Sequence, residues 1–292
     1  MSDSDISAAR ALIEIAAHNL AAIGIESSRL DAEVLMAEAA GVTREAVITG
    51  SIELSDAILN EFNAMVARRE QREPLAYIVG HKEFYSLDFD VGPAVLIPRP
   101  ETEFVVGAAL EYLKTKPDAR VLDIGTGSGA IAIAIAVNAP HARVTTTEIS
   151  LHACAFAIRN LLRHGLHGLV SDRRADCFEI VDKGARLRSF DVIVSNPPYL
   201  SGAEIAALEP EVRDYEPIVA LSAGADGLDI LRRIAAGAPR HLTKGGELIV
   251  EVGAGQAPAV TKLVEEAGLR DVTVINDFAG HPRVVRARKL AA

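Results

Sequence analysis

Aromatic residues and cysteines are scarce in this sequence of 292 residues. It contains no Trp, and aromatic residues make up only 4% of the chain. Proteins that bind single-stranded nucleic acid stack successive bases on aromatic side chains, so the composition does not favour that class. The two cysteines, Cys154 and Cys177, form no C-x-x-C pair. The sequence therefore predicts neither a metal site nor a disulfide framework.

Basic residues are also in deficit, with 30 Lys and Arg against 40 Asp and Glu, for a formal net charge of −10. A protein that binds mainly through nucleic-acid phosphates needs an excess of basic residues, so we expect no stable nucleic-acid binding. No run of about 18 apolar residues is present, which predicts no membrane span. The acidic start, Met-Ser-Asp-Ser-Asp, resembles no signal or transit peptide, so we expect a cytoplasmic protein.

The first part of the chain has a helical pattern. Apolar residues recur at steps of three and four, which predicts a small helical domain over residues 1–80. Ser28 with Asp31 resembles a capping box at the start of one helix, and Gly41 is placed to end that helix. Ser55 is expected to cap another.

A short segment of different pattern follows. Residues 81–98 hold near-alternating apolar residues, then Gly92-Pro93, then a second apolar run at 95–97. A turn between two such runs predicts a β-hairpin whose bend is the Gly-Pro pair. We expect this hairpin to link two domains.

Residues 99–292 are expected to form a second domain, in which short apolar strands alternate with helices. This alternation predicts an α/β fold with a mostly parallel sheet that is covered on both faces. No helix separates the last two strands, so they should pair antiparallel at one edge of the sheet. The expected strands are 120–124, 143–149, 169–175, 191–195, 246–252, 271–277 and 283–289, and the expected helices are 129–138, 151–164, 226–238 and 256–267.

A glycine-rich turn follows the first of these strands and opens a helix. Its sequence, Gly125-Thr126-Gly127-Ser128-Gly129, lets the backbone adopt positive φ and approach a ligand closely. Such a turn suits a nucleotide or nucleoside, and the spacing also fits a dinucleotide site. Glu148, at the end of the next strand, can accept hydrogen bonds from both hydroxyls of a ribose, as in NAD and S-adenosylmethionine sites.

A second motif, Asn196-Pro197-Pro198-Tyr199, ends a later strand. Ligands of open α/β sheets bind at the carboxyl ends of the strands, so we expect this motif to face the same crevice as the glycine turn. The prolines leave backbone carbonyls without intervening N–H donors, and Asn196 adds a side-chain carbonyl. These acceptors can hold both N–H bonds of an –NH2 group while Tyr199 packs on the planar group that carries it.

This arrangement suits methylation of an amide, because resonance makes an amide nitrogen a poor nucleophile. Accepting hydrogen bonds from both of its N–H groups returns electron density to the nitrogen. Fixing it in line with a sulfonium methyl lowers the entropic part of the barrier. We therefore predict that Asn196, Pro197 and Tyr199 carry the reaction.

With these motifs, the sequence resembles the release factor glutamine methyltransferases, also known as the PrmC or HemK family. The resemblance extends over nearly the whole chain, and its motifs occur in the family's order. The segments that carry it are Leu-Ile-Pro-Arg-Pro-Glu-Thr-Glu at 96–103, Asn-Pro-Pro-Tyr at 196–199, and residues 208–213, 216–217, 226–229, 245–248 and 279–285.

The resemblance implies a class I S-adenosylmethionine-dependent methyltransferase, with a seven-stranded Rossmann-like sheet, a helical N-terminal domain and a hairpin linker. It implies N5-methylation of the glutamine in the Gly-Gly-Gln loop of a peptide-chain release factor. The family usually shows Asp where this chain has Glu148. The residues that would then contact the cofactor are Gly125, Thr126, Gly127, Ser128, Gly129, Glu148 and Asn196, with Asp176, Cys177 and Phe178 near the adenine; Asn196, Pro197, Pro198 and Tyr199 would hold the glutamine.

Four other functions remain open at this point. A glutamine of a ribosomal protein is one alternative substrate. A DNA adenine N6-methyltransferase uses a similar motif, although the net charge counts against it. An NAD-dependent oxidoreductase would use the glycine turn and Glu148 but leave 196–199 without a role. A binding module that keeps the cofactor without activity is the fourth.

Two sets of arginines are harder to place. Arg68, Arg69 and Arg72 are expected on a solvated helix face, with contact to a partner as the alternative. Arg99, between two prolines beside the predicted crevice, is a candidate for substrate contact. The sequence does not separate that role from structural pairing.

Overall fold

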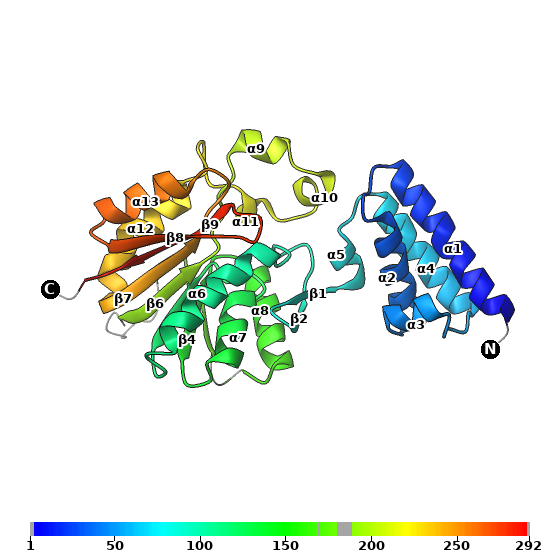
Figure 1. Ribbon diagram of the computed structural model, residues 1–292, viewed down its shortest axis with the longest axis horizontal. Helices are drawn as coiled ribbons and strands as arrows, with labels where there is room; N and C mark the ends of the chain where they lie inside the picture. The colour runs from blue at the N-terminus through cyan, green and yellow to red at the C-terminus, as the bar shows by residue number, and fades with distance from the viewer. Residues whose placement is uncertain (1–2, 167, 169, 180–188, 291–292) are drawn as a thin grey trace. The chain divides into compact units, whose positions relative to one another are not determined.

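The computed structural model describes residues 3–166, 168, 170–179 and 189–290, which divide into two compact units (Figure 1). The helical unit consists of Met1–Gly80 together with a distant segment, Glu209–Tyr215. The α/β unit consists of His81–Leu208 and Glu216–Ala292. The helical unit is therefore assembled from two separate stretches of sequence.

Helices of the helical unit enclose a small apolar core that includes Leu35, Met36 and Phe62, each at most 2% exposed. Core residues of the first helix, such as Ala9, Ile13 and Ala16, recur at steps of three and four, which is why this segment folds as an amphipathic helix with one face in the core. The helices are α1 (Asp3–Ala22), α2 (Ser28–Ala40), α3 (Arg44–Thr49), α4 (Asp56–Glu70), α5 (Leu75–Val79) and, in the distant segment, α10 (Pro210–Arg213).

Two of the three capping predictions are confirmed. Ser55 caps α4 by accepting a hydrogen bond from the backbone N–H of Ile58, and Gly41 ends α2 in the left-handed conformation. The capping box at Ser28 and Asp31 was wrong. Asp31 is 2% exposed and instead binds the Nε of Arg69 at 2.8 Å. A buried guanidinium without a carboxylate partner is strongly destabilising. The backbone N–H groups at a helix end can bind water instead of a side-chain cap.

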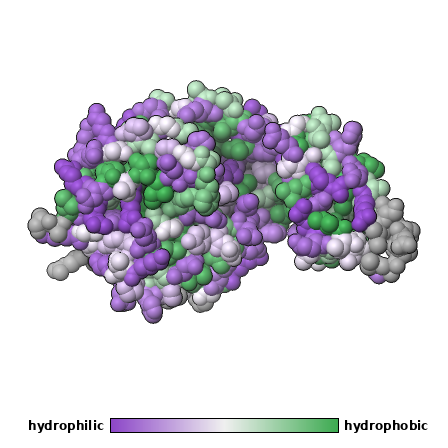
Figure 2. Space-filling view, viewed as in Figure 1, coloured by the Kyte–Doolittle hydropathy of each residue, from purple (hydrophilic) through white to green (hydrophobic). Residues whose placement is uncertain are grey.

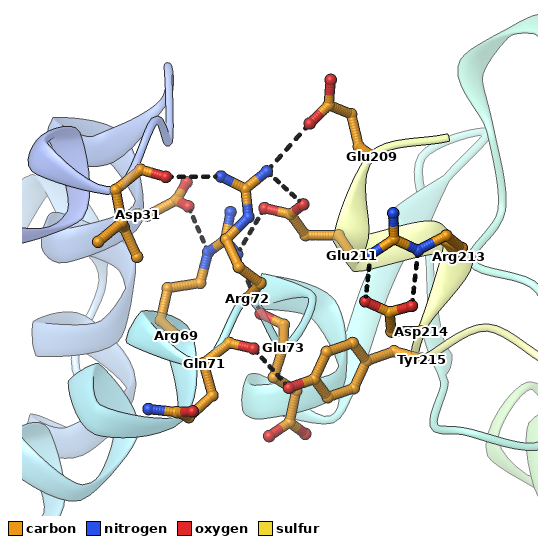
Figure 3. A network of polar contacts seen from close by, with 11 residues as sticks. Asp31, Arg69, Gln71, Arg72, Glu73, Glu209, Glu211, Arg213, Asp214 and Tyr215 are labelled. Atoms are coloured by element: carbon orange, nitrogen blue, oxygen red, sulfur yellow. Dashed lines mark hydrogen bonds and ion pairs between the residues drawn. The ribbon is translucent and has the colours of Figure 1, made fainter. Parts of the chain in front are cut away.

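The prediction of a solvated arginine face holds only for Arg68, whose side chain is 46% exposed. Arg69 is 5% exposed and binds both Asp31 and Glu211 (Figure 3). Arg72 also binds Glu211, at 2.6 Å. Helical periodicity does not reveal that Glu211, about 140 positions later in the sequence, covers this face of the helix. Only the folded structure brings the arginines and this glutamate together.

A β-hairpin opens the α/β unit, but its bend lies earlier than predicted. Strand β1 (His81–Phe84) pairs antiparallel with β2 (Leu87–Asp90), and Tyr85 and Ser86 form the bend with φ of 53° and 59°. Two residues with positive φ match the twist of a two-residue hairpin turn. The turn at Gly92-Pro93 leads into a loop rather than a second strand, so residues 95–97 are not a strand.

Seven strands form the sheet, in the order β5-β4-β3-β6-β7-β9-β8. The first five are parallel, whereas β9 is antiparallel to both β7 and β8. This confirms the predicted mostly parallel sheet with an antiparallel pair at one edge. The strands are β3 (Arg120–Ile124), β4 (Arg143–Glu148), β5 (Val170–Arg174), β6 (Phe190–Ser195), β7 (Leu242–Glu251), β8 (Arg270–Asn276) and β9 (Pro282–Arg288).

Strand limits agree with the predictions to within a few residues. The largest difference is at β7, which begins at Leu242 rather than at 246. Its extra residues include Thr243, Lys244 and Gly245, which are not apolar and so did not extend the apolar pattern. Residue 169, the predicted start of β5, lies outside the described residues.

Helices cover both faces of the sheet: α6, α7 and α8 lie on one side, and α12 and α13 on the other (Figure 1). The apolar core beneath α12 and α13 joins Leu122, Ile193 and Leu248, all at most 1% exposed. Helix α6 was not predicted. The helices and turns of this unit are η1 (Pro100–Thr102), α6 (Glu103–Leu113), α7 (Ala130–Asn138), α8 (Leu151–Arg163), α9 (Gly202–Ala206), α11 (Ile218–Leu221), α12 (Asp229–His241) and α13 (Ala257–Glu266).

Hydrophilic and hydrophobic residues are intermixed on the face of the molecule seen in Figure 2. Within the described ranges, every helix is too short or too polar to span a bilayer.

Candidate active site

A cavity of about 460 Å³ lies at the carboxyl ends of β3, β4 and β6. Parallel strands of an open sheet present their loops at this edge, so segments far apart in sequence meet there. Most of the predicted site residues come together around it. Those that line the cavity are Gly125, Thr126, Gly127, Ser128, Glu148, Asp176, Cys177, Asn196, Pro197 and Pro198.

Four predicted residues, all of them described, lie outside the lining: Gly129, Phe178, Tyr199 and Arg99. Gly129 is the N-cap of α7 with a φ of 87°, and a Cβ there would come within 3.0 Å of Ile133. It therefore permits the tight entry into the helix rather than facing the cavity.

The glycine turn has a left-handed backbone, which glycine adopts without strain. Gly125 and Gly127 have φ of 71° and 56°, in the left-handed region. The N–H of Gly125 donates to the carbonyl of Thr147 at 2.8 Å, which ties the turn to the neighbouring strand. The turn can therefore bring main-chain atoms close to a ligand in the cavity.

Glu148 is fixed at the cavity by two backbone donors. Its Oε2 accepts from the N–H of Gly127 at 3.0 Å, and its Oε1 accepts from the N–H of Ser150 at 2.9 Å. A carboxylate has about four acceptor positions, so each oxygen keeps one for a ligand. This geometry suits the two vicinal hydroxyls of a ribose.

The segment after β5 reaches the cavity through Asp176 and Cys177. Asp176 pairs with Arg233 at 2.8 Å, and Arg233 also lines the cavity. Burial raises the pKa of the Cys177 thiol to about 11, so it is a neutral, weakly polar wall rather than a nucleophile. The predicted cavity position of Phe178 is not observed, because its ring turns inward and stacks on His241 with centroids 4.6 Å apart.

The Asn-Pro-Pro-Tyr motif is anchored from both ends. Just before it, the Ser195 hydroxyl donates to the carbonyl of Ile124 at 2.7 Å. At the other end, Gln256 Nε2 donates to the carbonyl of Tyr199 at 2.8 Å. The side-chain Nδ2 of Asn196 donates to Thr102 Oγ1 at 3.0 Å. The acceptor groups at 196–198 are therefore held rigidly at the cavity.

Tyr199 differs from its predicted position over the substrate. Its hydroxyl points to Glu251, with 3.4 Å between the two oxygens, and its ring packs against the core beneath α12 and α13. Burial, together with the charge of Glu251, raises the pKa of Tyr199 well above its ordinary value. The phenol therefore stays protonated and remains a hydrogen-bond donor.

Arg99 forms a structural pair, one of the two roles that the sequence left open. Its guanidinium binds the carboxylate of Glu216, which is 5% exposed and also accepts from the N–H of Ile97 at 3.3 Å. Burial raises the pKa of Glu216, and Arg99 opposes that rise. The pair therefore joins the segment at 97–99 to Glu216, and Pro98 of that segment lines the cavity.

Sequence reasoning missed Thr102, Glu251 and Gln256. Glu251 ends an apolar strand at the carboxyl edge of the sheet, the same signal that identified Glu148. Thr102 and Gln256 lie outside the strands, and nothing in their local sequence indicates that they contact Asn196 and Tyr199. In the part of the chain that the structure describes, no group of three or more His, Cys, Asp or Glu could hold a metal ion.

Two families of known proteins match the chain. Residues 11–80 match the PrmC N-terminal domain, and residues 106–209 match the methyltransferase small domain. A release factor glutamine methyltransferase of Geobacter sulfurreducens is 43% identical, over 92% of this chain and 92% of its own. Another, of Cereibacter sphaeroides, is 42% identical, over 96% of this chain and 98% of its own.

Among solved structures, a methyltransferase from Pyrococcus furiosus is similar in fold, with a TM-score of 0.51 and 20% identity. The similarity covers 78% of this chain and 98% of that one. At this level of identity the likeness concerns the fold alone.

Proposed function

This chain belongs to the release factor glutamine methyltransferase family, and from that premise we propose that it transfers a methyl group from S-adenosylmethionine to the side-chain amide nitrogen of a glutamine in a peptide-chain release factor. The glutamine of the Gly-Gly-Gln loop is the proposed acceptor. The main support for this proposal is the rigid set of hydrogen-bond acceptors at 196–198, which borders the same cavity as the glycine turn. An amide nitrogen is activated where both of its N–H bonds meet acceptors.

The residues of the cavity fit S-adenosylmethionine. The open turn at Gly125 and Gly127 gives main-chain access, and the free acceptor positions of Glu148 suit the ribose hydroxyls. Bound there, the cofactor supplies an electrophilic methyl group on a sulfonium. The acceptors at 196–198 orient the glutamine nitrogen toward that methyl.

The acceptor groups act without a proton-removing side chain at the nitrogen. Oδ1 of Asn196 and the backbone carbonyl of Pro197 accept the two N–H bonds, which increases electron density on the nitrogen. Once the methyl is transferred, the nitrogen is cationic and strongly acidic, so its proton passes to solvent. Positioning and electrostatics thus supply the rate enhancement.

We also propose a division of labour along the chain. Residues 1–80 recognise the release factor, residues 81–98 link the two parts, and residues 99–292 bind the cofactor and carry out the transfer. A role in translation termination supports a cytoplasmic location for the protein.

Replacing Glu148 by glutamine should weaken cofactor binding. Loss of the charge weakens two hydrogen bonds to the ribose, each worth about 1.5 to 3 kcal/mol, so the Kd should rise about tenfold or more. Calorimetric titration with S-adenosylhomocysteine measures this. Glu265→Gln, at an exposed position of α13, is the matched control. An unchanged Kd in Glu148→Gln would remove Glu148 from the cofactor site.

The proposed reaction is tested by mass spectrometry of an unmethylated release factor after incubation with this protein and S-adenosylmethionine. We expect a gain of one methyl group, on the glutamine of the Gly-Gly-Gln loop. No gain in a protein that binds the cofactor would reject the release factor as substrate. Ribosomal protein and DNA substrates would then be assayed in the same way.

A further inference from the structure

A buried chain of hydrogen bonds lies behind Asn196. Its Nδ2 is 3.0 Å from Oγ1 of Thr102, and that hydroxyl is 2.6 Å from Oε2 of Glu251. Thr102 is 4% exposed and Glu251 is 2% exposed. The other carboxylate oxygen, Oε1, accepts from the Tyr199 hydroxyl at 3.4 Å. Three segments that are distant in sequence, 102, 196–199 and 251, thus share one polar network.

The protons of this network can be placed by counting donors and acceptors. The Thr102 hydroxyl has one proton, and an ionised carboxylate can only accept. That proton therefore goes to Glu251, and the remaining lone pairs of Oγ1 can only accept. The Asn196 atom beside Oγ1 must then be the –NH2 donor. Its carbonyl oxygen, Oδ1, is turned away from Thr102.

This orientation matters because the two ends of an asparagine amide have nearly the same shape but opposite hydrogen-bonding character. Turned as it is, the side chain offers an acceptor to the –NH2 group of the substrate. Turned by 180°, it would oppose a donor with a donor, which costs binding and removes the activation of the nitrogen.

We infer that Thr102 and Glu251 are positioning residues for the methyl transfer, which hold the Asn196 amide so that its carbonyl oxygen faces the acceptor nitrogen. This inference rests on the proposed function, because it assumes that Asn196 accepts from a substrate –NH2 group. Thr102 also lines the cavity, but its hydroxyl is bonded to Asn196 and Glu251, so both residues act on the transfer through Asn196.

The charge of Glu251 determines which groups donate and which accept in this hydrogen-bond network. Its surroundings include the hydroxyls of Thr102 and Tyr199, the like charge of Glu101 and the opposite charge of Arg283. Burial is the largest influence and raises the pKa of Glu251 to about 7. A protonated Glu251 can donate to Thr102, whose own proton then becomes available to Oδ1 of Asn196. Acid should therefore allow the reversed, inactive orientation.

The decisive variant is Thr102→Val, which keeps the shape of the side chain and removes the hydroxyl. We expect kcat for methyl transfer to fall about 10- to 100-fold, as for a misplaced reacting group, while the Kd for S-adenosylhomocysteine is unchanged. Thr102→Ser restores the hydroxyl and should recover most of the rate. Thr273→Val, on the exposed edge strand β8, is the matched control.

A double-mutant cycle separates positioning from a general structural role. In an Asn196→Ala background, the Thr102→Val substitution should not change the single-turnover rate. If Thr102→Val lowers the rate equally in both backgrounds, Thr102 does not act through Asn196 and the inference is overturned. Failure of the proposed function would give a different result from failure of this inference. The wild-type protein would then methylate no release factor, or the Asn196→Ala variant would be fully active.

The pH profile tests Glu251 separately. In the wild type, kcat should rise with pH, with a midpoint near the pKa of about 7, and then level off. Glu251→Gln should show a lower plateau without this acid limb. A raised carboxyl pKa stabilises the fold at low pH, and this stabilisation is lost as the pH rises through 7. The neutral variant should therefore be at least as stable as wild type at pH 8. An acid limb that persists in Glu251→Gln would overturn the role of Glu251.

Discussion

Replacement of Asn196 by alanine is expected to lower the rate of methyl transfer by about two to three orders of magnitude, as when one donor or acceptor of a rigid catalytic site is removed. The side chain supplies one of the two acceptors that activate the glutamine nitrogen, and it is held by Thr102 at 3.0 Å. The backbone carbonyls of the motif remain, so a residual rate should persist. Quenched-flow assays with radiolabelled cofactor measure the rate.

Cofactor affinity is the accompanying control. Asn196→Ala should change the Kd for S-adenosylhomocysteine little, because Glu148 and the glycine turn supply the main contacts proposed for it. Asn276→Ala, at the exposed end of β8, should leave the rate as in wild type. A rate that is unaffected by loss of Asn196 would reject the proposed mechanism, whatever the substrate.

Replacement of Arg69 by alanine is expected to lower the free energy of unfolding by about 3 to 5 kcal/mol, the usual result when one partner of a buried ion pair is removed. Arg69 is 5% exposed, and its Nε and Nη1 bind Asp31 at 2.8 Å and Glu211 at 2.9 Å (Figure 3). Its loss leaves the Asp31 carboxylate buried without a cation. Urea unfolding followed by circular dichroism measures the change.

Arg68→Ala is the matched control, since it removes the same group from the next position on α4. The Arg68 side chain is 46% exposed and pairs with Glu73, so its loss should cost less than about 1 kcal/mol. Adding Asp31→Leu to Arg69→Met should recover much of the lost stability, because it removes the stranded charge. Equal losses in Arg68→Ala and Arg69→Ala would show that burial of the pair is unimportant.

Much of the fold could be predicted from local sequence. Runs of apolar residues give the seven strands, and the glycine turn at 125–129 marks the carboxyl edge of the sheet. Caps such as Ser55 are visible because they act within one turn of their helix. Parallel strands end at the same edge, so the meeting of the glycine turn, Glu148 and Asn196 also follows from the strand assignments.

The errors concern interactions between residues that are distant in sequence. Asp31 looked like a cap because its partner, Arg69, is 38 positions away. Gly92 looked like a hairpin bend, but a Cβ there would lie 2.8 Å from the ring of Phe156, so close packing accounts for the glycine. Thr102 was missed because the sequence does not show that the fold brings it 3.0 Å from Asn196. Periodicity reports on one element at a time, whereas these contacts depend on how elements pack.

The divided make-up of the helical unit has a consequence for work on chimeric proteins. Residues 209–215 complete a unit whose other residues end at Gly80, and Glu211 of that segment neutralises Arg69 and Arg72. The modular boundary is therefore not a single point in the gene. An exchange of this unit between related proteins has to transfer two separate coding segments together. If only one is exchanged, Arg69 and Arg72 come from one parent and the segment at 209–215 from the other.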